Sequence, residues 1–174
     1  SSAAKDATVG YQPKRSFAGT KTNTSVLETP VAIQVIPREV IEDRQSQSSL
    51  DAVKNASGVQ AAPGTVYDQF MIRGFTTGGA GTAYRNGLAL RGTIGQVDMA
   101  FVDRIEVIKG PVSTLYGRAE PGGFVNVVTK KPQEDSHVSV QQQFGSWGLA
   151  RTTADATGSL NEDKTILYRV IGAY

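Results

Sequence analysis

The 174-residue sequence contains no cysteine, one histidine (His137) and one tryptophan (Trp147). The missing cysteines exclude disulfide bonds and thiolate-ligated metal sites. The charge is nearly balanced, with 18 Lys and Arg residues against 16 Asp and Glu residues. A net charge of +2 is too small to favour nucleic acid or an anionic membrane surface as a partner. No apolar run approaches the roughly 20 residues that a transmembrane helix needs.

Residues that could carry out catalysis are equally scarce. His137 stands alone at the edge of a predicted strand, and no Ser-His-Asp set or metal cluster can be assembled around it. The carboxylate pairs at 134–135 and 162–163 lie in turn-like stretches, where solvated charge is the ordinary outcome. The glycine-rich stretch 117–123 lacks the Gly-Lys-Ser/Thr ending that places a lysine on nucleotide phosphates. These features predict a protein that is not an enzyme.

Regular structure is predicted to begin near Thr29, because residues 1–28 are polar and show no sustained period. Helices are predicted after Pro37 and after Ser48, the second one ending at Gly58. The stretch 76–82 is rich in glycine and predicts a loop. Strands are predicted at 32–36, 70–73, 104–109 and 124–129. This pattern predicts an α+β domain around a small sheet.

Two local patterns in this domain are sharp. Asn86-Gly87 is the strongest short signal for a turn. In 104–109, Ile105 and Val107 fall on one face of the strand, whereas Arg104, Glu106 and Ile108 fall on the other.

The pattern changes after His137. Three runs of about ten residues, within 138–174, alternate apolar and polar side chains and are separated by turns at 145–148 and 161–164. Such runs are typical of membrane β-barrels, but an ordinary half-buried antiparallel meander has the same pattern. Periodicity alone favours the meander.

Motifs in a fixed order occupy residues 20–132. The longest is VDRIEVIKGPVSTLYG at 102–117, followed by PGGFVNVVTKKP at 121–132. They are preceded by KTNT at 21–24 with TPVAIQVI at 29–36, by LDAVKNASGV at 50–59, and by YDQFMIRGF at 67–75 with YRNGL at 84–88. This set resembles the plug of the TonB-dependent outer-membrane siderophore receptor family, in particular the hydroxamate-type receptors for ferrichrome and ferrioxamine.

The resemblance implies a flexible leader at 1–28 and an α+β plug domain with a small mixed β-sheet at 29–132. It implies that residues 133–174 are about the first three antiparallel strands of a truncated outer-membrane β-barrel. The receptor would lie in the bacterial outer membrane, surrounded by lipid, with its plug facing the periplasm and the extracellular ligand pocket. It would bind a ferric siderophore and import it with energy from TonB and its inner-membrane complex. Iron would enter only as part of the ligand, with no cofactor and no nucleic acid.

In such plugs, the loops that face outward form the floor of the ligand pocket, and here they correspond to 60–67, 76–84 and 91–97. Aromatic faces would pack on the ligand, and Arg or Gln side chains would donate hydrogen bonds to it. Where the ferrichrome receptor carries an aromatic pair, this chain has Ile94-Gly95, so either the ligand differs or barrel loops supply the aromatic groups. The candidate ligand-binding residues are Tyr67, Tyr84, Arg91, Thr93, Ile94 and Gln96.

Two further sets of residues follow from the resemblance. Four charged residues are expected to hydrogen-bond to the barrel wall or to each other, the alternative being ordinary surface ion pairs; they are Arg73, Arg104, Glu106 and Arg118. The segment Lys5-Asp6-Ala7-Thr8-Val9 resembles a TonB box, which can add as a strand to the edge of the partner's sheet. The alternative for this segment is a featureless tail.

Other functions remain open at this point. A TonB-dependent receptor for haem or cobalamin is one, although the GPVSTLYG run at 110–117 favours a siderophore. A signalling or transducer module is another, and it is disfavoured because the sequence begins close to the plug. A soluble enzyme domain is disfavoured by the lack of a catalytic set.

Overall fold

The computed structural model describes residues 15–16, 24–25, 31–54, 56–62, 69–77, 83–90, 97–110 and 121–174. These residues fall into two compact units, 15–129 and 130–174, which are described separately. No helix within the described ranges is long and apolar enough to cross a membrane.

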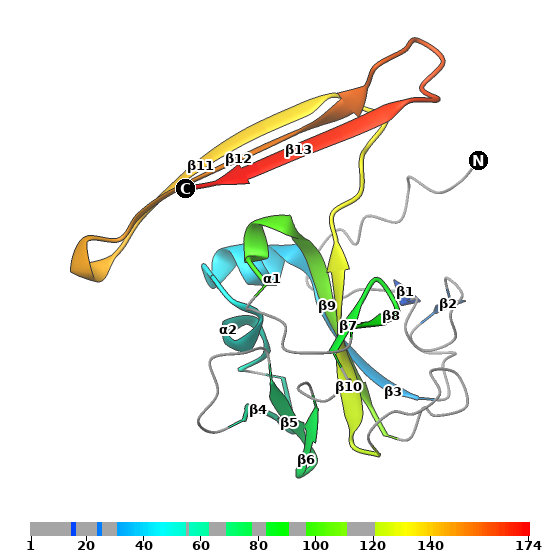
Figure 1. The fold of residues 1–174 in the computed structure, drawn as a ribbon, viewed down its shortest axis with the longest axis vertical. Coiled ribbons are helices and arrows are strands. Elements are labelled where there is room, and N and C mark those ends of the chain that lie inside the picture. The colour runs from blue at the N-terminus through cyan, green and yellow to red at the C-terminus, as the bar shows by residue number, and fades with distance from the viewer. Residues whose placement is uncertain are drawn as a thin grey trace. The chain divides into compact units, whose positions relative to one another are not determined.

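A mixed sheet of five described strands forms the centre of the first unit, in the order β3-β9-β10-β7-β8 (Figure 1). Strands β10 and β7 pair in parallel, and the other neighbours pair antiparallel. The strands are β3 (Ala32–Ile36), β7 (Ala83–Arg85), β8 (Leu88–Leu90), β9 (Val102–Lys109) and β10 (Gly123–Thr129). The mixed sheet is therefore confirmed, and β3, β9 and β10 are the strands predicted at 32–36, 104–109 and 124–129.

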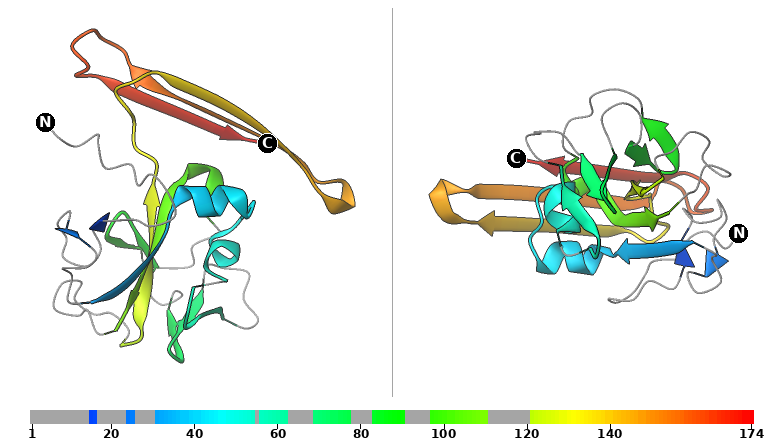
Figure 2. Two further views of the ribbon diagram at one scale, coloured as in Figure 1. Left: turned by 180° about the vertical axis from the view of Figure 1, so that it is seen from behind. Right: turned by 90° about the horizontal axis from the view of Figure 1, so that it is seen from below.

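Both faces of β9 are buried at residues 105–108, whereas alternation alone indicates a strand that is buried on one face. Ile105 and Val107 belong to the larger core cluster, whereas Ile108 belongs to a second cluster with Phe124 and Tyr84. The larger cluster also includes residues of α1 (Arg38–Asp43), α2 (Ser49–Val53), β4 (Val59–Ala61) and β5 (Phe70–Ile72). Figure 2 shows the two helices on the same side of the central sheet. Their apolar side chains therefore cover one face of the sheet.

The helix starts follow the predicted signals. Pro37 is the N-cap of α1, and the Arg38 guanidinium donates to the carbonyl oxygens of Met99 and Val102. Ser48 caps α2, because its Oγ accepts from the Asp51 amide at 3.2 Å. The predicted helix end at Gly58 is wrong: α2 ends at Val53, and the chain turns through further bonds from Ala56 to Val53 and from Val59 to Ala56.

Strands β4, β5 and β6 (Phe75–Thr77) form a small antiparallel sheet, so the strand predicted at 70–73 does not join the central sheet. Two further predictions are corrected here. Arg73 is not the end of a strand, because Arg73 and Gly74 form the two-residue turn of the β5–β6 hairpin with φ angles of 52° and 84°. Residues 76 and 77 are not loop but strand, because this turn folds them back onto β5. Positive φ at both turn positions matches the right-handed twist of paired strands.

Asn86 and Gly87 form the turn between β7 and β8, as predicted, with φ angles of 51° and 80°. The turn is tied to the end of β10. The backbone N–H of Asn86 donates to the carbonyl oxygen of Val127, and the Asn86 side chain both donates to and accepts from Thr129. The short hairpin is therefore held against the longest pair of strands in the unit.

Outside the central sheet, β1 (Arg15–Ser16) and β2 (Thr24–Ser25) form a two-stranded antiparallel pair, so the prediction that regular structure begins near Thr29 is wrong. The second unit is an antiparallel sheet in the order β11-β12-β13. Its strands are β11 (His137–Phe144), β12 (Ala150–Ser159) and β13 (Leu167–Ala173), which match the three alternating runs predicted after His137.

Candidate functional site

The structure places residues 60–61, 76–77 and 83–84, which are predicted to belong to the ligand loops, in strands β4, β6 and β7. Residues 63–68 lie between Ala62 and Gln69, whose backbone groups hydrogen-bond at 3.0 Å. Phe70 pairs with both Ala61 and Thr77, so residues 78–82 leave from the same end of the small sheet. Those five residues lead to Ala83, which pairs with Leu90, the last described residue before 91–96. The six steps from Thr77 to Ala83 span at most roughly 22 Å, so residues 91–96 begin within a bounded distance of the other two segments.

Most predicted site residues lie outside the described residues. These are Tyr67, Arg91, Thr93, Ile94 and Gln96 among the ligand candidates, Arg118 among the charged set, and all of Lys5, Asp6, Ala7, Thr8 and Val9. Their proposed roles stay predictions.

Tyr84 is the one ligand candidate that the structure describes. Its ring is 2% exposed and packs on Phe124 with a ring-centroid distance of 4.1 Å. Burial raises the pKa of the Tyr84 hydroxyl. The side chain therefore packs in the second core cluster, and its contact with a ligand stays a prediction.

Arg104 and Glu106 meet in a buried polar network on the same face of the sheet. The Arg104 Nε donates to Glu106 Oε1 at 2.9 Å, and Asn126 Nδ2 donates to Glu106 Oε2 at 3.0 Å. The Gly87 amide then donates to Asn126 Oδ1 at 2.9 Å. Both carboxylate oxygens of Glu106, which is fully buried, are thus bound within the first unit. The network links β9, β10 and the turn after β7.

The charge of Arg104 is stabilised by two carboxylates. Burial disfavours the guanidinium, but Glu106 and then Asp103 outweigh it and raise the pKa of Arg104 above its ordinary value. Asp103 Oδ2 lies 2.8 Å from Arg104 Nη1. Arg104 and Glu106 are therefore bonded to each other, and a contact of either with a barrel wall stays a prediction.

Arg73 lies at the opposite end of β9, close to Lys109. Its amide donates to Gly58 O, and its guanidinium lies beside Gly110. Lys109 Nζ donates to Gln34 Oε1 and Ser57 Oγ, both at 2.8 Å. Burial, and next the charge of Arg73, lower the pKa of Lys109.

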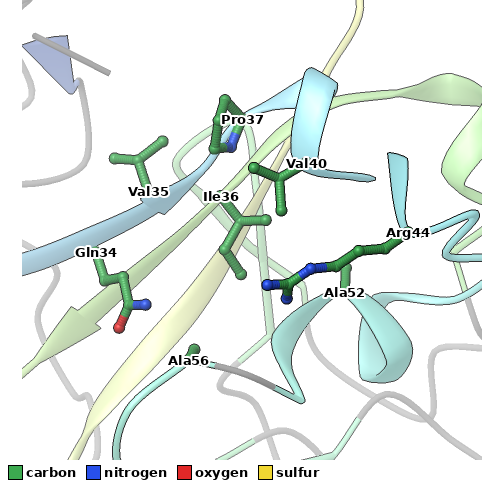
Figure 3. A pocket seen from close by; sticks show the side chains of 8 residues that line it. All are labelled: Gln34, Val35, Ile36, Pro37, Val40, Arg44, Ala52 and Ala56. Atoms are coloured by element: carbon green, nitrogen blue, oxygen red, sulfur yellow. The ribbon is translucent and has the colours of Figure 1, made fainter. Parts of the chain in front are cut away.

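A small pocket lies between β3 and the two helices (Figure 3). Val35, Ile36 and Val40 supply apolar walls, and Arg44 directs its guanidinium into the pocket. Its volume of about 140 Å³ is well below the roughly 300–1,000 Å³ of clefts that hold drug-sized ligands. A siderophore does not fit in this space, so the loop end remains the candidate site.

No group of His, Asp and Glu side chains in the described part of the chain could hold a metal ion.

Residues 25–124 match the family described as the TonB-dependent Receptor Plug Domain. The chain belongs to this family. The strands that follow the plug are a few strands of an unclosed barrel.

Similar proteins are outer-membrane receptors rather than enzymes. The chain is 39% identical to the metal-pseudopaline receptor CntO of Pseudomonas aeruginosa, over 92% of this chain and 23% of that protein. It is 34% identical to the ferrichrome outer membrane transporter/phage receptor of Escherichia coli, over 91% of this chain and 22% of that protein. It superposes on the alcaligin outer-membrane receptor FauA of Bordetella pertussis with a TM-score of 0.84 at 26% identity, covering 98% of this chain and 31% of that chain. The chain thus spans about a quarter of the length of the curated relatives.

The strands after the plug expose one apolar face. Val138 and Val140 of β11 lie opposite Ala156 and Ala154 of β12, and both valines are exposed. On the other face, Asp155 and Thr157 are buried. An apolar face backed by a polar one is the arrangement of strands that separate lipid from the interior of a barrel.

Asn126 is the buried member of this polar network that sequence reasoning missed. It holds Glu106 and the turn amide of Gly87 together. Its only sequence signal is an Asn at the centre of a strongly apolar strand, FVNVV, where an amide needs partners. The identity of those partners depends on the pairing of Asn126 with Glu106 across two strands.

Proposed function

We propose that this chain is the plug and barrel start of a bacterial outer-membrane receptor that binds a ferric siderophore and imports it with energy transmitted by TonB. The observation that carries the proposal is that residues 63–68 and 78–82 leave from one end of the small sheet, and that residues 91–96 follow Leu90, which pairs with Ala83 at the end of 78–82. Three loops of this kind can form one floor for a ligand, with Tyr67, Arg91 and Gln96 as the groups that contact it. The similarity to the ferrichrome transporter supports this ligand class.

Residues 5–9 are proposed as the TonB box. A short extended segment can join the edge of a partner's sheet, where main-chain hydrogen bonds supply the affinity. Ligand binding and the TonB contact would then be separate sites, coupled through the plug. In this arrangement, the leader lies on the periplasmic side of the plug, and the loops lie at the extracellular ligand pocket. Iron enters with the siderophore, and no cofactor takes part.

A paired measurement on the whole receptor tests the proposal. Deletion of Lys5–Val9 is expected to abolish energised iron uptake and to leave siderophore affinity nearly unchanged. Thr8→Pro is expected to act like the deletion, because proline removes an N–H that strand addition requires. Thr20→Pro is the control, since it places the same change in the leader outside the box. Arg91→Ala is expected to weaken siderophore binding while TonB still binds the box. Uptake that survives the deletion, or affinity that falls with it, would contradict the assignment.

A second ligand class has a specific observation in its favour. The identity with the metal-pseudopaline receptor is 39% over nearly the whole chain, and Ile94-Gly95 departs from the aromatic pair of the ferrichrome pattern. The receptor would then take a metal complex of a pseudopaline-like chelator. Competition between such a complex and ferric hydroxamates for the purified receptor separates the two classes. At equal concentration, the ligand that the receptor recognises should displace the other one, and the reverse displacement should not occur.

A further inference from the structure

Residues 130–136, which follow β10 and precede β11, form a segment that we call the exit segment. Its first residue is bound to the middle strand of the second unit. Lys130 Nζ donates to Asp155 Oδ2 at 2.8 Å, and Arg169 Nε and Nη2 donate to the two oxygens of Asp155 at 2.9 and 2.7 Å. The three side chains are 10–13% exposed. One carboxylate of β12 therefore holds a cation of the exit segment and a cation of β13.

The backbone of the exit segment is held as well. Arg169 Nη1 donates to the carbonyl oxygen of Lys131 at 2.7 Å, and the amide of Gln133 donates to Thr157 Oγ1 at 2.9 Å. Thr157 is fully buried, and its hydroxyl donates to Tyr168 O. These contacts fix the chain path at two successive points beyond Lys130.

Gly158 shows how closely the exit segment passes over β12. A Cβ at this position would lie 2.8 Å from Ser136 Oγ and 3.3 Å from Ser136 Cα. The first distance is too short for a carbon atom and the second is tight, so a side chain at 158 would force Ser136 to shift. The exit segment is thus in contact with the sheet from Lys130 to Ser136.

The residue just before this segment is held differently. Thr129, the last residue of β10, pairs with Val102 of β9 beyond a register shift, and it is bound through neutral hydrogen bonds of 2.9 Å to the side chain of Asn86, which is exposed. Charge-assisted hydrogen bonds are roughly twice as strong as neutral ones, and water competes with bonds at an exposed site. Under tension, the bonds before Lys130 are therefore expected to break before those that follow it.

We propose that the exit segment is a mechanical anchor, which stays on β12 and β13 when the plug is displaced or partly unfolded. The proposal rests on the proposed function, since TonB-driven import is what loads the plug. Tension that passes along β10 ends at Lys130, Asp155 and Arg169. Strand β11 then carries no load, and its register with β12 is preserved while the plug moves.

Single-molecule pulling on the full receptor in a lipid bilayer, from a handle at its N-terminal end, tests the anchor. In the wild type, we expect the plug to extend up to Thr129 and then to stop, with a separate event at higher force that releases the exit segment. Asp155→Ala is expected to abolish this last event. Asp135→Ala is the matched control, because it removes only the exposed Asp135–Lys164 pair of the same segment and should leave the event unchanged.

Asp155→Ala could also impair folding of the barrel, so a second variant leaves every strand residue intact. Lys130→Ala with Gln133→Pro removes the lysine cation and the amide donor of the exit segment alone, and it should also abolish the last event. Persistence of the event at wild-type force in this double variant would overturn the anchor, as would wild-type extension beyond Lys130 without a stop. Pulling needs no siderophore, so loss of iron uptake in the wild type would count against the proposed function and not against the anchor.

Discussion

Strands β9 and β12 both lie inside a sheet, and they differ in what covers their faces. Ile105 and Val107 of β9 are fully buried on one face, and Glu106 and Ile108 are fully buried on the other. On β12, Asp155 and Thr157 are buried, but the opposite face belongs to a surface on which Val138, Val140 and Val170 are exposed. The same alternation of apolar and polar residues therefore occurs in a strand whose two faces are both covered by other parts of the protein, and in a strand of a sheet whose apolar face is exposed.

The largest expected contrast comes from one substitution made in both units. Phe124→Ala removes a fully buried ring and its contact with Tyr84, and should lower the free energy of unfolding of the plug by about 3–5 kcal/mol. Phe144→Ala removes a ring of the second unit that is 77% exposed. In water, this substitution should change the free energy of unfolding of that unit by less than about 0.5 kcal/mol. Urea unfolding followed by hydrogen exchange in each unit measures both values. Equal losses would contradict the comparison.

The polar network of β9 should give the next largest effect. Glu106→Gln keeps the size of the side chain but removes the charge that faces Arg104, and should destabilise the plug by about 2 kcal/mol. Asp103→Asn is the control, because its carboxylate is 42% exposed and water replaces much of its contact with Arg104. Urea midpoints of both variants at neutral pH test this ordering. A larger loss for Asp103→Asn would refute the central role of Glu106.

Helix α2 provides a smaller test inside the plug. Ser48→Ala removes the hydroxyl that accepts from the Asp51 amide, and should cost about 1 kcal/mol. Ser57→Ala is a comparison outside the cap, where the hydroxyl belongs to an exposed residue. Faster hydrogen exchange at Ala52 and Val53 in the first variant, but not in the second, would support the cap. Unchanged exchange in both would argue against it.

The smallest effect concerns pH. The hydrogen bond from Lys54 is the main cause that lowers the pKa of Asp51 below its ordinary value of 3.8. A lowered pKa in the folded state adds stability above the unfolded pKa, and this stability is lost as the pH falls through the folded pKa. Wild type should therefore exceed Asp51→Asn in urea midpoint at neutral pH, and the two should converge below pH 3.8. A difference that is constant with pH would rule out this linkage.

The local elements of the plug were largely predictable because their signals are short in range. The Asn86-Gly87 turn needs only two residues that tolerate positive φ, and the Ser48 cap needs only a hydroxyl three residues before an amide. Residues 75–77 could not be assigned in this way. Their strand exists because the Arg73-Gly74 turn returns them to β5, although arginine seldom adopts positive φ.

The features of the candidate site also differ in whether they depend on neighbouring residues or on contacts between distant residues. The order of motifs identified the plug family, and the alternation in 104–109 identified which side chains share a face, because both are properties of neighbouring residues. The burial of Tyr84 on Phe124, the bonds of Glu106 to Asn126, and the hold of Asp155 on Lys130 and Arg169 join residues 14 to 40 positions apart. Such contacts depend on strand order and register, because a shift of one residue in register would move every side chain of a strand to the opposite face. Only the tertiary structure could decide them.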